Sequence, residues 1–196
     1  QDNFSFTIYI SIMWFIGGLG NPDSVHNLTR HNLGFDVVDS LVNYYKFKVL
    51  KKDKNKELYQ GYIDNEKCFI CKPLNYINLS GPVISEIIKF YKIPKQKIII
   101  IHDDIDLIVG KIKTKIGGGN GGHNGLASID ESIGVNYKRI RIGVGHPGSK
   151  ELVSKYVLKK FLKDERNIID KKINLLTKYF SLVFENEGLL LTKIAL

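Results

Sequence analysis

Eight residues near the middle of the chain indicate its fold class: Lys97-Ile98-Ile99-Ile100-Ile101-His102-Asp103-Asp104. The four consecutive isoleucines predict a central β-strand, because an uninterrupted apolar run suits a strand that is covered on both faces. The run ends in a histidine and two aspartates, so polar side chains follow the carboxyl end of the strand. This arrangement is typical of an α/β domain that binds its ligand beyond the carboxyl ends of its strands.

Segments on both sides of this strand alternate between strand-like and helix-like patterns. The other predicted strands are residues 14–19, 57–63, 66–72, 110–116 and 139–144. The predicted helices are residues 32–47, 83–91, 126–133 and 164–185. The alternation predicts a single-domain, three-layer α/β sandwich in which helices flank a twisted sheet.

The composition is that of a globular protein of ordinary size. Of 196 residues, 43% are hydrophobic and 25% are charged, which fits one folded domain and excludes a disordered chain. The formal net charge of +9 favours a polyanionic partner such as nucleic acid or acidic lipid, although a coat of solvated lysines gives the same value. No apolar run approaches the roughly 20 residues of a membrane span, so we expect no membrane-embedded segment.

The first twelve residues differ from those that follow. They lack the basic region and the cleavage site of a signal peptide, and Met13 directly precedes the first predicted strand. We therefore expect residues 1–12 to be a non-native or disordered leader and residues 13–196 to form the domain. Cys68 and Cys71 lie in an apolar run without further zinc ligands, so we expect buried, reduced thiols, which suit a cytoplasmic protein.

Two polar segments flank the start of the first predicted helix. Gly18-Leu19-Gly20-Asn21-Pro22 follows the first strand, and Thr29-Arg30-His31-Asn32 opens the helix. Because Asn21 leaves a strand end and His31 begins a helix, both side chains are able to face one crevice. A lone histidine is more often structural, but the polar residues around His31 favour a functional role.

Two further polar loops follow predicted strands. Residues 72–81 include Asn78, whose amide donates and accepts hydrogen bonds, although a turn or capping role fits it equally. Residues 102–106 carry three aspartates, but the sequence offers no matching set of metal ligands. We therefore expect no metal ion, and instead expect one carboxylate to orient a histidine.

Residues 117–125 read Gly-Gly-Gly-Asn-Gly-Gly-His-Asn-Gly. So many glycines allow a ligand to approach the backbone closely and leave amide groups able to meet an anion. A flexible linker explains the glycines but not His123 and Asn124 at the start of the next helix. A nucleotide-binding enzyme is a weaker alternative, because the loop matches neither a P-loop nor a dinucleotide-binding motif.

The predicted strands beside this loop carry cations at alternate positions. Lys111, Lys113 and Lys115 precede the loop, and Arg139 and Arg141 follow it. Alternate residues of a strand share a face, so each set forms a stripe of positive charge. Stripes on both sides of one loop predict a track for a phosphate backbone.

Taken together, these segments resemble the bacterial peptidyl-tRNA hydrolase family. The matching patterns, in order along the chain, are G-L-G-N-P, T-R-H-N-x-G, N-x-S-G, H-D-x-x-D, G-G-G-x-G-G-H-N-G and R-x-R-I-G-x-G-H-P-G. The resemblance implies a monomer with a central mixed, mostly parallel sheet. It also implies hydrolysis, without a cofactor, of the ester between a peptide or N-blocked aminoacyl group and the 3′ ribose of tRNA, which releases tRNA for translation.

The resemblance also implies roles for individual residues. His31 is the expected general base and Asp103 its carboxylate partner. The expected substrate contacts are Asn21, Asn78, Asn124, His123, Ile77 and His26, and the expected tRNA contacts are Lys113, Lys115 and Arg141. Ile77 and His26 stand where the family usually has Met and Tyr, so we expect different packing at the first position and loss of a tyrosine contact at the second.

These residue types suit ester hydrolysis. A neutral imidazole activates water without a metal, and a carboxylate fixes its tautomer. Amide donors from Asn21, Asn124 or the loop backbone are candidates for stabilising the oxyanion. The alternative is a catalytically inactive RNA-binding or splicing and assembly factor of the same fold. Such a protein has no need of His31, Asp103 and Asn21 together, and this chain keeps all three.

Overall fold

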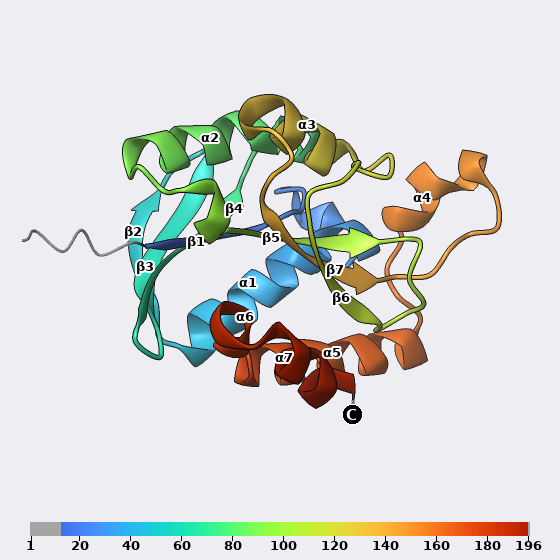
Figure 1. Ribbon diagram of the computed structural model, residues 1–196. Helices are drawn as coiled ribbons and strands as arrows, with labels where there is room; N and C mark the ends of the chain where they lie inside the picture. The colour runs from blue at the N-terminus through green and yellow to red at the C-terminus, as the bar shows by residue number, and fades with distance from the viewer. Residues whose placement is uncertain (1–12, 196) are drawn as a thin grey trace, which may run out of the picture.

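Seven strands form one sheet at the centre of the structure, a computed structural model that describes residues 13–195 (Figure 1). The predicted leader, residues 1–12, lies outside the described residues. The strands are β1 (Trp14–Gly18), β2 (Lys48–Lys52), β3 (Lys56–Ile63), β4 (Glu66–Pro73), β5 (Ile98–Asp104), β6 (Ile112–Ile116) and β7 (Lys138–Gly143).

Helices of two kinds connect these strands. The α-helices are α1 (Leu33–Tyr44), α2 (Ser80–Phe90), α3 (Asn124–Ile133), α4 (Val153–Val157), α5 (Lys163–Lys178), α6 (Leu182–Glu185) and α7 (Glu187–Ala195). Single 3-10 turns are η1 (Ser24–His26), η2 (Arg30–Asn32), η3 (Ile77–Leu79), η4 (Lys95–Lys97) and η5 (Lys150–Leu152). No helix within residues 13–195 has both the length and the apolar character needed to cross a bilayer.

The strand order is β2-β3-β4-β1-β5-β7-β6. The central strands pair in parallel, β4 with β1, β1 with β5, and β5 with β7. The outer pairs, β2 with β3, β3 with β4, and β6 with β7, are antiparallel. The mixed, mostly parallel sheet is confirmed, because five of these seven strands, β2, β4, β1, β5 and β7, run in one direction and β3 and β6 run in the other.

Two apolar clusters sandwich the sheet. Helices α2 and α3 cover one face, and α1 together with α5, α6 and α7 covers the other (Figure 1). Successive isoleucines of β5 enter opposite clusters, with Ile98 and Ile100 under α2 and α3, and Ile99 and Ile101 under α1. All four are fully buried. The predicted three-layer sandwich around a central, doubly covered strand is therefore confirmed.

Helix α1 approaches β1 and β5 very closely at Gly34. A Cβ atom on Gly34 would lie 2.3 Å from the Leu19 nitrogen and 2.5 Å from the Ile101 oxygen. A Cβ atom on Gly18 would lie 2.3 Å from the Gly34 oxygen. Only glycine permits this contact, and because η2 leads directly into α1, the contact brings His31 to the carboxyl ends of both strands.

The carboxyl-terminal region differs from prediction. The single helix expected over residues 164–185 is wrong, since α5 ends at Lys178 and the chain turns before α6 and α7. The turn has a packing reason, because it directs Phe180 and Val183 into the core. Asn186 then precedes α7 and caps it, since its side-chain oxygen accepts a hydrogen bond from the Leu189 N–H at 3.0 Å.

The two cysteines are buried and form no disulfide, as expected. Cys68 and Cys71 lie on β4 with an odd separation, so they belong to the apolar clusters on opposite faces of the sheet. Burial raises the pKa of Cys68 to about 12. This thiol is therefore a packing group in a strand.

Candidate active site

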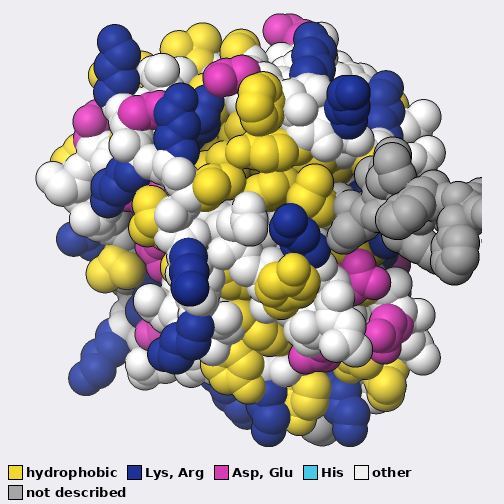
Figure 2. Space-filling model, turned by 90° about the vertical axis from the view of Figure 1, so that its left-hand side faces the viewer, with side chains coloured by type: hydrophobic (Ala, Val, Ile, Leu, Met, Phe, Trp, Pro, Cys, Tyr) yellow, Lys and Arg dark blue, Asp and Glu magenta, His cyan; other side chains and the backbone are white. Residues whose placement is uncertain are grey.

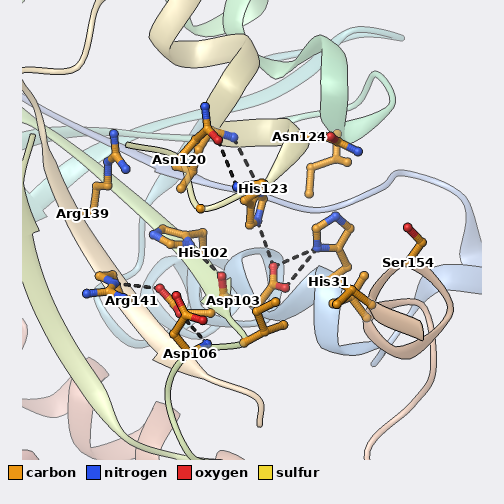
Figure 3. Close-up of a pocket in the computed structure, with 18 of the residues that line it drawn as sticks. His31, His102, Asp103, Asp106, Asn120, His123, Asn124, Arg139, Arg141 and Ser154 are labelled. Carbon is orange, nitrogen blue, oxygen red and sulfur yellow. Dashed lines mark hydrogen bonds and ion pairs between the residues drawn. The ribbon is translucent and has the colours of Figure 1, made fainter. Parts of the chain in front are cut away.

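A cavity of about 440 Å³ opens at the carboxyl ends of β1 and β5, between the glycine-rich loop, α3 and α4 (Figure 3). Many residues singled out from the sequence line this one cavity, although they are distant in the chain. They are Asn21, His31, Ile77, Asp103, Lys115, His123, Asn124 and Arg141.

His31 and Asp103 meet at the centre of the cavity. The Nδ1 atom of His31 lies 3.0 Å from Oδ1 and 3.1 Å from Oδ2 of Asp103. Both side chains are buried, so this is a close pair in a region of low dielectric. Because an ionised carboxylate only accepts hydrogen bonds, Nδ1 of His31 carries the proton. The lone pair of the neutral ring is then on Nε2, the nitrogen that has no partner among the described residues.

His123 is a second partner of the same carboxylate. Its Nε2 atom lies 3.1 Å from Oδ1 of Asp103, and its Nδ1 atom accepts hydrogen bonds from the N–H groups of Gly125 and Leu126. His123 therefore caps α3 with one nitrogen and donates to Asp103 with the other. The two backbone donors fix the tautomer of the neutral ring, which is the tautomer that Asp103 requires.

The pair of histidines controls the charge of the carboxylate. Burial tends to raise the pKa of Asp103, but the two imidazoles hold it well below its usual range, so Asp103 is ionised. Burial also lowers the pKa of His31, whereas the charge of Asp103 and its hydrogen bond raise it, and the net result lies above the ordinary value. His31 is thus a base strengthened by its carboxylate partner.

His31, Asp103 and His123 present ligand atoms within 4.8 Å of one another, so we tested them as a metal site. A metal ion at Nε2 of His123 needs the lone pair of that nitrogen, which leaves the ring proton on Nδ1. There it would face the N–H groups of Gly125 and Leu126. Two donors directed at a third do not form hydrogen bonds, so this arrangement does not fit a metal ion.

Asn21 is held in one orientation at the floor of the cavity. Its side-chain Oδ1 accepts the Ile77 N–H at 3.0 Å. Its backbone N–H and carbonyl both bond to the side chain of Asn32, at 2.8 and 2.9 Å. The carbonyl oxygen of the Asn21 amide is therefore used internally, and the NH₂ group is the part left to contact a ligand.

Three predicted site residues do not line the cavity. Asn78 lies exposed on η3, although its neighbour Ile77 does reach the cavity. His26 is half-buried in η1, where its backbone oxygen accepts the Thr29 hydroxyl. Lys113 is exposed on β6 and borders a separate hollow beside α7.

The predicted cationic stripes divide into two kinds of residue. Across the antiparallel pair, Lys113 stands opposite Arg141 and Lys115 opposite Arg139. The lysines are exposed, and Arg141 is bound through Nε to Asp104 at 2.7 Å, with its terminal nitrogens unpaired among the described residues. Arg139, however, is only 2% exposed and bonded internally. The paired cationic surface expected from Arg139 and Arg141 is therefore wrong.

Charge on the rest of the surface is scattered. Figure 2 shows the left-hand side of Figure 1, where lysines and arginines alternate with apolar side chains and form no continuous stripe. The net charge of +9 is thus partly a general coat. Two cations from the predicted stripes, Lys115 and Arg141, by contrast line the cavity itself.

Several lining residues were missed by sequence reasoning. They are His102, Asn120 and four residues on or next to α4, namely Val153, Ser154, Val157 and Leu158. His102 adjoins Asp103 in the H-D-x-x-D pattern, which was the available signal. It donates through Nδ1 to the Asp103 carbonyl at 2.7 Å, and burial lowers its pKa to about 3. Helix α4 has only five residues, too few for a periodic pattern.

The fold and this cavity define an α/β protein with a buried histidine–carboxylate pair beside a glycine-rich loop. The family model described as peptidyl-tRNA hydrolase matches residues 15–193. The chain belongs to the peptidyl-tRNA hydrolase family.

Individual relatives agree with this membership. The peptidyl-tRNA hydrolase of Rickettsia canadensis is 46% identical over 176 residues, which cover 89% of this chain and 95% of that protein. The one from Bartonella quintana is 42% identical, with 89% and 91% covered. The crystal structure of peptidyl-tRNA hydrolase from Acinetobacter baumannii superimposes with a TM-score of 0.87 at 39% identity, covering 94% of this chain and 95% of that one.

Proposed function

We propose that this chain hydrolyses the ester bond between a peptide, or an N-blocked aminoacyl group, and the 3′ ribose of tRNA. The observation that carries the proposal is the contact of His31 Nδ1 with both oxygens of Asp103 inside the cavity. In this arrangement Nε2 of His31 accepts a proton from water as the water attacks the ester carbonyl. Asp103 stabilises the imidazolium that forms, and the proton then passes to the departing ribose oxygen.

Amide donors near the base suit the negative charge that develops on the carbonyl oxygen. The NH₂ group of Asn21 is available, because its Oδ1 is bound to the Ile77 N–H. Asn124 lies at the first turn of α3 and lines the same cavity (Figure 3). Donors held in place before the reaction stabilise an oxyanion without reorganisation. We assign substrate contacts to both asparagines, with His123 and Ile77 beside them.

We assign the tRNA phosphates to the cations next to the glycine-rich loop. Lys115 lines the cavity, Lys113 follows on the same face of β6, and Arg141 has unpaired terminal nitrogens. Positive groups at this spacing fit a phosphate backbone. Asn78 and His26 lie outside the cavity lining, so we assign them a role only with the longer substrate bound.

We propose that the protein acts as a monomer, since the general base His31, its carboxylate partner Asp103 and Asn21 all come from the same chain and line one cavity. We also infer that residues 13–196 suffice for activity, since the family match begins at residue 15. A protein that starts at Met13 should elute as a monomer and retain activity. Unfolding or inactivity of that protein would contradict this inference. We propose that the protein is located in the cytoplasm, where tRNA takes part in translation.

The direct test is incubation with N-blocked aminoacyl-tRNA in the presence of a chelator, with release of free tRNA as the readout. We expect complete hydrolysis, because no step uses a metal. A protein that binds this tRNA tightly but releases none would instead be an RNA-binding factor. No observation favours that alternative, since the general base, its carboxylate and Asn21 share one cavity.

A further inference from the structure

Arg139 is buried beside the active site and has no part in the proton transfer described above. We propose that Arg139 is a positioning residue, which holds the glycine-rich loop and α3 so that His123 and Asn124 face the catalytic pair. The expected effect on catalysis depends on the proposed function. The positioning role itself depends only on the contacts that the guanidinium makes.

The guanidinium of Arg139 bonds to two loop carbonyls and one helix side chain. One terminal nitrogen donates to the Gly119 oxygen at 2.9 Å, and the other donates to the Gly118 oxygen at 3.0 Å. The second nitrogen also lies 3.1 Å from Oδ1 of Asp130, in the middle of α3. A planar fork with fixed donor directions is able to serve all three acceptors at once.

The positive charge is neutralised inside the protein. Asp130 accepts from Arg139 and also from the Tyr137 hydroxyl at 2.8 Å. The side chain of Arg139 is 2% exposed, and its guanidinium lies over the Tyr137 ring, 4.9 Å from the ring centroid. The Nε atom of Arg139 has no hydrogen-bond partner among the described residues, but it is buried, so the guanidinium lacks the exposure that a phosphate contact needs.

The loop depends on this arginine for its shape. Gly118 has a φ of +83°, a conformation that a glycine adopts without strain but does not itself stabilise. Within residues 13–195, Arg139 makes the hydrogen bonds to the carbonyls of Gly118 and Gly119, and no backbone group does so. Without the guanidinium, the carbonyls of these two residues would have no hydrogen bond to the sheet.

The contacts of Arg139 lead to the catalytic pair in two steps. The loop ends at His123, which caps α3, and Asp130 lies two turns further along the same helix. Arg139 therefore fixes both the loop before the helix, through its carbonyls, and the helix itself, through Asp130. A shift of α3 moves His123 away from Asp103, to which it lies at 3.1 Å. The loss of that contact leaves the carboxylate with one partner fewer.

The test compares Arg139→Lys with Lys115→Met, which removes an exposed cation at the cross-strand position. Steady-state kinetics on N-blocked aminoacyl-tRNA are measured at several salt concentrations. For Arg139→Lys we expect kcat to fall by about 10- to 100-fold, with an unchanged slope of log kcat/KM against log salt. For Lys115→Met we expect a higher KM and a slope reduced by about 0.7 to 0.9.

A second readout does not depend on activity. Amide hydrogen exchange should become faster at residues 117–126 in Arg139→Lys, because the loop and the cap of α3 are loosened. If wild-type protein fails to hydrolyse the substrate, the proposed function is wrong and exchange alone decides the positioning role. If Arg139→Lys fails to fold, Asp130→Ala is judged by the same two measurements.

Two results would overturn the proposal. The first is a slope that falls in Arg139→Lys as it does in Lys115→Met while kcat is unchanged, which would make Arg139 a phosphate contact. The second is wild-type kcat together with wild-type exchange at residues 117–126. Asp130→Ala separates the two roles. Removing this carboxylate should strengthen tRNA binding if Arg139 acts through charge alone, and should lower kcat if Arg139 positions the loop and α3.

Discussion

Replacing Asp103 with asparagine keeps the size of the side chain and removes its charge. In the structure both carboxylate oxygens lie within 3.1 Å of His31 Nδ1. An asparagine offers one oxygen and one NH₂ group, so one of those contacts becomes repulsive. If the NH₂ group donates to Nδ1, the ring proton moves to Nε2 and the base is lost. If the oxygen faces Nδ1, the tautomer is kept without the negative charge.

The distance sets the size of the effect. Opposite unit charges 3 Å apart interact by about 5 kcal/mol at an effective dielectric constant near 20. The asparagine dipole retains part of this stabilisation of the imidazolium. We therefore expect the hydrolysis rate to fall by about 10² to 10⁴, equivalent to roughly 3 to 5 kcal/mol in the barrier.

The assay is single-turnover hydrolysis of N-blocked aminoacyl-tRNA with the protein in excess, so that substrate binding does not limit the rate. Asp106→Asn is the matched control, because Asp106 borders the same cavity and has no contact with His31. Its rate should stay within about threefold of wild type. A rate for Asp103→Asn that is equally close to wild type would refute the role of the carboxylate.

Three further predictions concern pH, salt and packing. The single-turnover rate should fall as pH falls through the raised pKa of His31, because the base must be neutral; a midpoint below 6.5 would contradict the raised value. Lys113→Met should reduce the slope of log affinity for tRNA against log salt by about 0.7 to 0.9. Lys89→Met, which removes an exposed lysine on α2, should not change the slope, and equal slopes for the two variants would argue against the track. Gly34→Ala should lower the free energy of unfolding, measured by urea titration, by about 1 to 3 kcal/mol, since its Cβ would overlap backbone atoms of Leu19 and Ile101. Unchanged stability would mean that α1 packs less closely against β1 and β5 than the structure shows.

The part of the fold that sequence predicted best is the part with strong periodicity. The isoleucine run of β5 and the apolar stripe of α1 are both removed from water only when strand and helix pack against each other, so their patterns predict their positions. Strand β2 was missed because its residues, Lys48–Lys52, are all exposed. It owes its existence to pairing with β3, a tertiary contact that leaves no local pattern.

The candidate site was predictable in its residues but not in its contacts. The motifs named His31 and Asp103, and both line the cavity. The alternate spacing on β7 predicted the same role for Arg139 and Arg141. In the structure Arg139 is buried and bonded to Asp130 on α3, whereas Arg141 is bonded to Asp104 on β5 and lines the cavity. Such differences depend on which carboxylate lies opposite, and that is decided only when helix and strands pack together.

The most direct test of the account is a pair of measurements on His31→Ala, its affinity for uncleaved peptidyl-tRNA and its rate of cleaving that same substrate. We predict an affinity within about threefold of wild type and a rate at least about 100-fold lower, since the variant loses the base and keeps the cationic surface. Cleavage at the wild-type rate would contradict the assignment of this imidazole as the group that activates water.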